Sequence, residues 1–271
     1  MAIFVDNRLV SEFKFSGGEV HVTVQVNPEP SSKVIAYLNS SDDVMALIMV
    51  VDALRRVNPD VRIELTIPYF PYARQDRVCN PGESLSVKVM ADLINSLNCT
   101  SVTVYDPHSD VTPALLHRCK VESLASLVMQ TSLPTFIYEN DLTLVSPDAG
   151  AQKKTQELAR RLSLNGCSVK TLCATKTRDT LTGKIVATEI TGDVQGKNLI
   201  LLDDICDGGQ TFIELAQMLK AKGAAKLYLY ITHGIFSKGL APLKDHFTRV
   251  YCYYPITGTQ NVTDPFLTSL S

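Results

Sequence analysis

Residues 198–232, NLILLDDICDGGQTFIELAQMLKAKGAAKLYLYIT, contain the pattern that decides the fold. The segment opens with NLILLDD, an apolar run that is typical of a buried strand, and passes through a Gly-Gly turn into the amphipathic helix TFIELAQMLKAKG. A second apolar run, KLYLYIT, follows the helix. Strand, helix and strand in this order predict a βαβ unit whose two strands are parallel.

The same alternation extends outward to both ends of the chain. The first half has apolar strands at 34–38, 61–70 and 101–106, separated by helices at 42–57 and 84–97, and a hairpin strand at 20–26 precedes them. The second half adds strands at 141–146, 168–174 and 184–190 and a helix at 151–162. We therefore expect two tandem α/β domains, residues 1–137 and 138–271, each with a mainly parallel sheet covered by helices on both faces.

Composition and charge indicate which kind of ligand the protein binds and in which cellular compartment it is expected. The chain has 271 residues, 45% of them hydrophobic, and a formal net charge of -2, so no broad basic field is present for nucleic acid. No apolar run is long enough to span a membrane, and the N-terminus lacks the pattern of a signal peptide. The seven cysteines show no paired spacing and are expected to be free thiols. A cytoplasmic enzyme for a small polar ligand is the expectation.

Ligands of open α/β sheets bind beyond the carboxyl ends of the strands, which directs attention to the loop DDICDGGQT. Asp203 and Asp204 are suited to accept hydrogen bonds from vicinal ribose hydroxyls. Gly208 and Gly209 would let backbone N–H groups approach a phosphate at the start of the helix. The alternative is an ordinary turn with solvated acids, in which Asp207 caps the helix. A catalytic role for Cys206 is disfavoured because no histidine adjoins it.

Two further loops place potential metal ligands at strand ends. In SPDAG, Asp148 is suited to bind Mg²⁺ directly or through water, and the alternative is a helix N-cap. In YDPHSD, His108 could contact a metal or a phosphate, although a lone histidine at a strand end is more often a structural hydrogen-bonding residue.

Two basic segments could bind phosphate. PYARQDR presents Arg74 and Arg77 on either side of Gln75 and Asp76, and the alternative is a solvated charged loop. ATKTRDTLTG places Lys176 and Arg178 beyond a strand in a stretch that is typical of a mobile lid, where they could stabilise a transferring phosphoryl group. The alternative is an exposed hairpin tip without function.

Taken in order, IPYFPYARQDR, DPHSD, SPDAG, KTR and LLDDICDGGQT resemble the ribose-phosphate pyrophosphokinases, also called phosphoribosyl pyrophosphate synthetases. The resemblance spans nearly the whole chain and implies two domains of phosphoribosyltransferase-like fold. It also implies transfer of the pyrophosphoryl group of ATP to the anomeric hydroxyl of ribose 5-phosphate, with AMP as the second product.

The resemblance assigns roles to individual positions. Lys176 and Arg178 match residues of the family's catalytic loop, and Arg178 also matches a contact to the sugar phosphate. His108 and Asp148 match the histidine and aspartate that the family associates with Mg²⁺. The implied ribose 5-phosphate site consists of Asp203, Asp204, Asp207, Gly208, Gly209, Gln210 and Thr211. The implied ATP contacts are Arg74, Gln75 and Arg77, together with Phe15, Gly17 and Glu19 of the segment FSGGE, which in the family serves a neighbouring subunit and so implies a homo-oligomer.

Several departures from the family pattern are present, and two of them fall in the implied ligand sites. Gly17 replaces the usual aspartate of F-S-D-G-E, and DGGQT replaces D-T-A-G-T or D-T-G-G-T, with loss of a hydroxyl at Gly208 and gain of a side chain at Gln210. Two other functions stay open at this stage: a phosphoribosyltransferase that consumes phosphoribosyl pyrophosphate, and a non-catalytic regulatory homologue. The specific PYARQDR segment and the second domain argue against the former, and retention of Lys176, Arg178, His108 and Asp148 argues against the latter.

Overall fold

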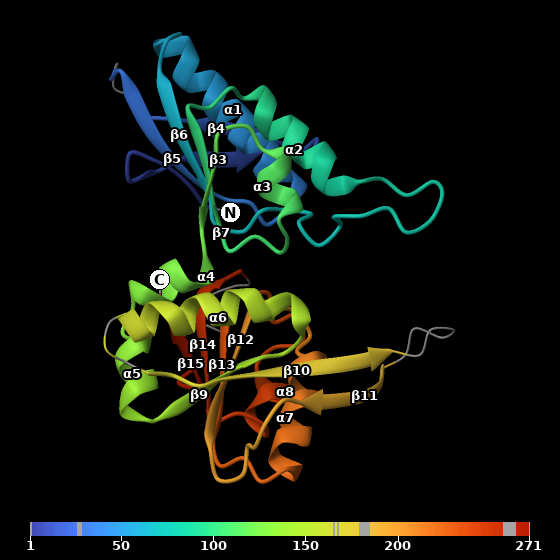
Figure 1. The fold of residues 1–271 in the computed structure, drawn as a ribbon. Coiled ribbons are helices and arrows are strands. Elements are labelled where there is room, and N and C mark those ends of the chain that lie inside the picture. Colours follow the sequence, from blue (N-terminus) through green and yellow to red (C-terminus); the bar gives the residue numbers. More distant parts are fainter. Residues whose placement is uncertain are drawn as a thin grey trace. The chain divides into compact units, whose positions relative to one another are not determined.

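The computed structural model describes residues 2–25, 29–164, 166, 168–178, 185–256 and 264–270. The chain forms two compact units, Met1–Glu122 and Ser123–Ser271 (Figure 1). The division lies N-terminal to the boundary expected after residue 137. The reason is that Leu124, Val128 and Ile137, from helices within 124–139, are buried in the same cluster as Leu142 and Leu158 of the second unit.

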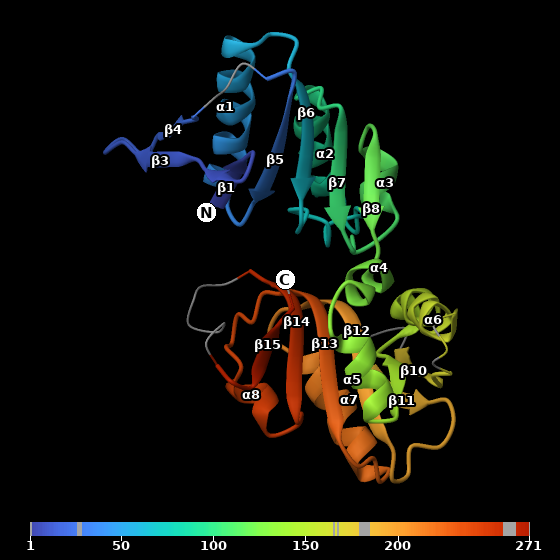
Figure 2. The ribbon, with the colours of Figure 1, turned by 90° about the vertical axis from the view of Figure 1, so that its left-hand side faces the viewer.

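The first unit is built on a six-stranded sheet in the order β2-β1-β5-β6-β7-β8. Strands β5 to β8 are parallel, whereas β1 is antiparallel to both of its neighbours. The strands are β1 (Ala2–Val5), β2 (Arg8–Leu9), β5 (Ser31–Tyr37), β6 (Arg62–Ile67), β7 (Ser101–Tyr105) and β8 (Cys119–Glu122). The helices are α1 (Ser41–Val57), α2 (Ser86–Ser96) and α3 (Val111–Leu115). A separate antiparallel hairpin, β3 (Ser11–Lys14) and β4 (Val20–Thr23), packs beside α1 (Figure 2).

The sequence analysis expected a helix over residues 42–57, and the structure places its N-cap at Ser40. The Ser40 hydroxyl accepts a hydrogen bond from Asp43 N, and the Asp43 carboxylate accepts one from Ser40 N at 2.8 Å. This reciprocal capping box satisfies two backbone donors that the helix itself cannot satisfy. The carboxylates of Asp42 and Asp43, in the first turn of α1, also interact favourably with the positive end of the helix dipole.

Among the described residues of the first unit, the helices pack on one face of the sheet, although coverage of both faces was expected. Burial alternates along β5 and β6, so that Val34 and Leu65 are fully buried while Lys33, Arg62 and Glu64 are exposed. An alternation of period two is the pattern of a sheet with one solvated face.

The second unit has a seven-stranded sheet in the order β11-β10-β9-β12-β13-β14-β15, parallel except for β11. The strands are β9 (Leu142–Ser146), β10 (Thr171–Arg178), β11 (Ile185–Ile190), β12 (Asn198–Cys206), β13 (Leu227–Gly234), β14 (Arg249–Pro255) and β15 (Leu267–Ser269). The helices are α4 (Leu124–Met129), α5 (Leu133–Glu139), α6 (Ala149–Leu164), α7 (Gln210–Ala221) and α8 (Ala241–Lys244).

Both faces of this sheet are covered, as expected. One apolar cluster joins the sheet to α7 and α8, and a second joins it to α4, α5 and α6. Strands β9 and β13 are buried at every position, which explains why they are recognisable as continuous apolar runs. The expected α/β architecture is thus confirmed, whereas β14, β15 and the short helices were not predicted.

Candidate active site

Strands β9, β12 and β13 of the second unit are parallel neighbours, so the loops that follow them meet at one edge of the sheet. Strand β12 is longer than its apolar run suggests, because Ile205 and Cys206 still pair with His233 and Gly234 of β13. Asp203 and Asp204 therefore lie within the strand, and the loop proper begins at Asp207.

Asp203 and Asp204 form a close carboxylate pair in a setting that disfavours two charges. Burial raises the pKa of Asp203 well above its usual value, and the neighbouring carboxylates of Asp204 and Asp148 raise it further. A positive charge also approaches this pair, since Lys154 Nζ of α6 lies 4.0 Å from Asp204 Oδ2. The edge of the sheet thus gathers carboxyl groups where a ligand with hydroxyl donors or a cation would be favoured.

The loop after β12 leads into α7 through Gly209, which is the N-cap with φ 78°. The N-cap is therefore Gly209 and not Asp207, the residue that the alternative interpretation named as cap. A Cβ on Gly209 would lie 3.0 Å from Leu243 Cδ2, and its left-handed backbone also favours glycine. Open N–H groups at the start of a helix are suited to bind a phosphate.

The structure defines the surroundings of two side chains near this loop, Gln210 and Cys206. Gln210 Nε2 donates to Glu214 Oε1 at 2.9 Å, which directs the Gln210 amide along the flank of α7. Cys206 is fully buried, and burial together with Asp203 and Asp207 raises the pKa of its thiol to about 12. A thiol of this kind is not a nucleophile at neutral pH, in agreement with the expectation.

Asp148 precedes α6 and makes the hydrogen bond expected of a helix cap. Its Oδ1 accepts from Ala151 N at 3.0 Å. One carboxylate oxygen is thereby fixed, and a capping aspartate can still offer its second oxygen to a cation. The capping interaction is observed, and the metal-binding role remains a prediction.

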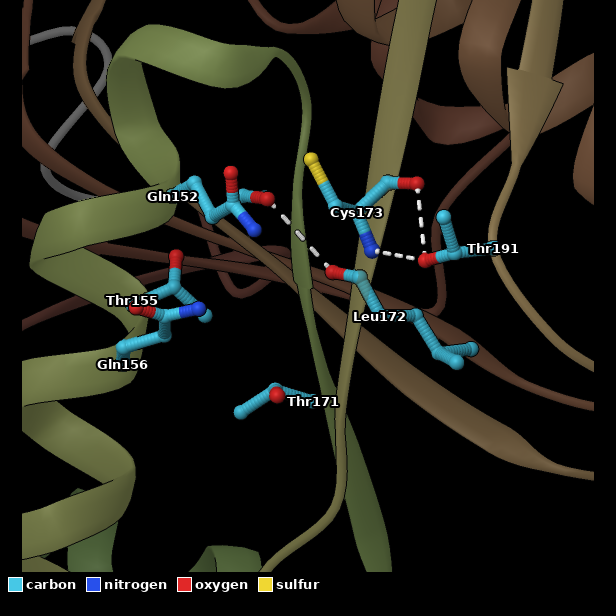
Figure 3. Close-up of a pocket in the computed structure, with 8 residues that line it drawn as sticks. Gln152, Thr155, Gln156, Thr171, Leu172, Cys173 and Thr191 are labelled. Carbon is cyan, nitrogen blue, oxygen red and sulfur yellow. Dashed lines mark hydrogen bonds between the residues drawn. The ribbon is translucent and has the colours of Figure 1, made fainter.

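A small polar cavity of about 60 Å³ lies between α6 and the start of β10 (Figure 3). Its hydrogen bonds include Cys173 N to Thr191 Oγ1 at 2.9 Å and Ser146 Oγ to Leu172 O at 3.5 Å. Its lining consists of Ser146, Gln152, Thr155, Gln156, Thr171, Leu172, Cys173 and Thr191. None of the predicted site residues lines it, and its volume suits a few water molecules rather than a sugar phosphate.

In the first unit, the loops after β6 and β7 follow adjacent parallel strands and are joined by Asp76. The Asp76 carboxylate accepts hydrogen bonds from Ser109 and from Arg77, whose Nε lies 3.3 Å away. Partial burial raises the pKa of Asp76, but these bonds and the charges of Arg77 and His108 outweigh it, and the net pKa is lowered. PYARQDR and YDPHSD, far apart in the sequence, therefore form one site.

The backbone of these two loops is held in uncommon conformations. Tyr72 and Asp106 have φ values of 61° and 37°, in the left-handed region that few residues adopt. Phe70 and Ala73 are each 2% exposed and anchor the first loop, which leaves Arg74, Gln75 and Arg77 exposed. Three polar side chains are thus presented to solvent from a fixed backbone.

The segment FSGGE forms the turn of the β3–β4 hairpin. Phe15 N donates to Glu19 O, and Gly18 N donates to Phe15 O, both at 2.8 Å. The Phe15 ring is half exposed and packs at 4.7 Å from the ring of Phe13, with His21 also in contact. Gly17 and Glu19 lie at the same exposed tip, so the structure presents an aromatic surface there.

Lys176 and Arg178 lie in β10, where they pair with Thr188 and Ile185 of the antiparallel strand β11. Their side chains, and residues 179–184 of the predicted lid, fall outside the part of the chain that the structure describes.

The predicted metal ligands His108 and Asp148 belong to different units. Within the described residues, no group of three or more His, Cys, Asp or Glu side chains is arranged to hold a metal ion. The described residues likewise include no helix with the length and apolar character needed to cross a membrane.

The sequence analysis assigned no role to Asp76 or Lys154. Asp76 was quoted only as a neighbour of the arginines, and its link to Ser109 could not be seen without the sheet. Lys154 lies in α6, and a helical projection would have placed it on the sheet-facing side near Thr155, which is 1% exposed.

Comparisons with known proteins identify the family of the chain. A family model described as the N-terminal domain of ribose phosphate pyrophosphokinase matches residues 5–97, and a phosphoribosyl synthetase-associated domain matches residues 168–247. The ribose-phosphate pyrophosphokinase of Granulibacter bethesdensis is 31% identical over 229 residues, which cover 83% of this chain and 72% of that protein. The enzyme of that name from Hyphomonas neptunium is 32% identical over 242 residues, covering 88% and 76%.

A crystal structure of phosphoribosylpyrophosphate synthetase from Mycobacterium smegmatis matches with a TM-score of 0.79 and 25% sequence identity. The match covers 97% of this chain and 85% of that one, and it confirms the fold that the sequence predicted. The chain belongs to the ribose-phosphate pyrophosphokinase family.

Proposed function

We propose that the protein is a Mg²⁺-dependent ribose-phosphate diphosphokinase that acts as a homo-oligomer. In this reaction the anomeric hydroxyl of ribose 5-phosphate attacks the β-phosphorus of ATP. The bond from that phosphorus to the oxygen bridging the α- and β-phosphates breaks, AMP leaves, and the hydroxyl proton is released. The observation that supports this function most directly is the left-handed glycine turn at Gly209, which leads into α7 directly after the acid pair Asp203 and Asp204.

The loop of α7 supplies the acceptor half of the proposed site. Backbone N–H groups from Asp207 to Thr211 bind the 5-phosphate at the positive end of the helix dipole. Asp203 and Asp204 accept hydrogen bonds from the ribose hydroxyls, which fixes the orientation of the sugar. Arg178 is a further contact to this substrate.

The loops of the first unit supply the nucleotide half. Arg74, Gln75 and Arg77 contact ATP, and Phe15, Gly17 and Glu19 contact the adenine. Asp76 and Ser109 keep Arg77 and His108 in position. Lys176 and Arg178 stabilise the negative charge that spreads over the transferring group, which is the main catalytic demand of phosphoryl transfer.

His108 and Asp148 would hold Mg²⁺ together with phosphate oxygens. The Asp148 carboxylate fits this ion, because Mg²⁺ is usually bound by one or two carboxylates plus phosphates and water rather than by an all-protein cage. When bound, the ion neutralises charge on the phosphates.

The test is formation of AMP from ATP, Mg²⁺ and ribose 5-phosphate, measured by chromatography. Ribose in place of ribose 5-phosphate is the control, since it lacks the group that the α7 loop binds. Stoichiometric AMP and phosphoribosyl pyrophosphate are expected. No AMP from the intact chain would refute the kinase and leave a non-catalytic homologue, whereas pyrophosphate release from phosphoribosyl pyrophosphate and a base would identify a phosphoribosyltransferase.

A further inference from the structure

The side chain of Lys238 lies against Gly208 in the loop that precedes α7. A Cβ on Gly208 would be 3.4 Å from Lys238 Cε, 3.5 Å from Cδ and 3.8 Å from Cγ. These are ordinary van der Waals distances, so the aliphatic stem lies directly against the loop at Gly208. Because Nζ is one bond beyond Cε, the ammonium group is held beside the loop.

The backbone that carries Lys238 is fixed to the same loop. Ile235 N and Phe236 N both donate to Cys206 O, at 2.8 and 3.1 Å, and Cys206 is the residue before Asp207. Gly239 N then donates to Phe236 O at 2.7 Å, which closes a turn with Ser237 and Lys238 at its corner. Phe236 and Leu240, each 3% exposed, anchor the two ends of this turn.

The charge of Lys238 is available to a ligand. Lys238 is exposed, and no hydrogen bond or ion pair joins its ammonium to another residue in the described part of the chain. A lysine presents a compact cation with three donors, a chemistry suited to a phosphate.

We infer that Lys238 is a binding residue for the 5-phosphate of the sugar and adds a positive charge to the main-chain donors of the α7 loop. This inference rests on the proposed function of that loop.

The decisive variant is Lys238→Met, which keeps an unbranched apolar stem and removes the charge. Its matched control is Lys222→Met, which removes an exposed lysine at the opposite end of α7. Binding of ribose 5-phosphate is measured by titration calorimetry at low and high salt, and AMP formation is measured on the same preparations. Lys238→Arg tests whether a positive charge restores binding, and thermal unfolding verifies that each variant is folded.

We expect Lys238→Met to weaken ribose 5-phosphate binding about tenfold, the scale of one hydrogen bond to a charged group, with kcat changed less than about twofold. Lys238→Arg should recover most of the affinity, and the salt dependence should be smaller in Lys238→Met than in the wild type. Unchanged affinity in Lys238→Met, with the wild type active, would overturn the role of Lys238 and leave the proposed function intact. A wild type that neither binds ribose 5-phosphate nor forms AMP would overturn both.

Discussion

Ser109 donates a side-chain hydrogen bond to Asp76, and this bond ties the loop after β7 to the loop after β6. Arg77 donates to the same carboxylate, and the Asp76 side chain is only 8% exposed. Asp76 therefore holds both Arg77 and the loop that contains His108. In the proposed ATP site, Asp76 is a positioning residue, which holds Arg77 and Ser109 in place.

Replacement of Asp76 by Asn should raise the KM for ATP about fivefold, because loss of the charged acceptor weakens the hold on Arg77 and Ser109 by about 1 kcal/mol. The KM for ribose 5-phosphate should not change. Initial rates of AMP formation with each substrate varied in turn provide the measurement. Asp92→Asn, which removes an exposed carboxylate from a surface ion pair of α2, is the control. An equal effect on both KM values would argue that the variant disturbs the fold instead.

Asp203→Asn should stabilise the ligand-free protein at neutral and alkaline pH while it reduces binding of ribose 5-phosphate. The pKa of Asp203 is raised in the folded state from an ordinary value of 3.8, so the folded protein holds this proton more tightly than the unfolded chain. The resulting stability is present below the unfolded pKa and is lost as pH rises through the folded pKa. Asparagine at position 203 does not ionise, so the variant does not lose this stability as the pH rises.

Thermal unfolding at about pH 4 and about pH 8 measures this effect. The midpoint of Asp203→Asn should exceed that of the wild type by a few degrees at the higher pH only, since about 1 kcal/mol shifts a domain of this size by roughly 2–4 °C. Asp245→Asn, at an exposed position, is the control. A lower midpoint for Asp203→Asn at the higher pH would contradict the argument.

Gln210→Ala should leave the affinity for ribose 5-phosphate within about twofold of the wild type, because the Gln210 amide is bonded to Glu214 and backbone donors survive the substitution. Thr211→Ala should weaken binding several-fold if its hydroxyl contributes to the cradle. Titration calorimetry measures the ribose 5-phosphate affinity of both variants and so compares two neighbouring side chains in the first turn of α7. A large loss in Gln210→Ala would show that its amide turns toward the ligand when the site is filled.

Lys176→Ala should lower kcat by about two to three orders of magnitude, the scale of losing one charge-stabilising donor, while ribose 5-phosphate binding is retained. Single-turnover formation of AMP isolates this step from product release. Lys170→Ala, just before β10, removes an exposed lysine of the same unit as a control. Near-normal turnover in Lys176→Ala would exclude this residue from the mechanism.

The sequence by itself determined the alternation of strands and helices and the identity of the loops to be searched. The strand prediction was correct at β9, β12 and β13 because strands buried on both faces of a sheet are apolar along most of their length. Such strands appear in the sequence as continuous apolar runs. The start of α1 was visible for a similar reason, since the capping box is a local interaction between Ser40 and Asp43.

Only the tertiary structure decided which residues meet across the chain. The division after Glu122 depends on where α4 and α5 find an apolar surface, and the contacts of Asp76 with Ser109 and of Lys238 with Gly208 depend on the order of strands in each sheet. Burial and capping are set by residues a few positions apart. Contacts between loops are set by long-range packing, for which a single sequence contains no local signal.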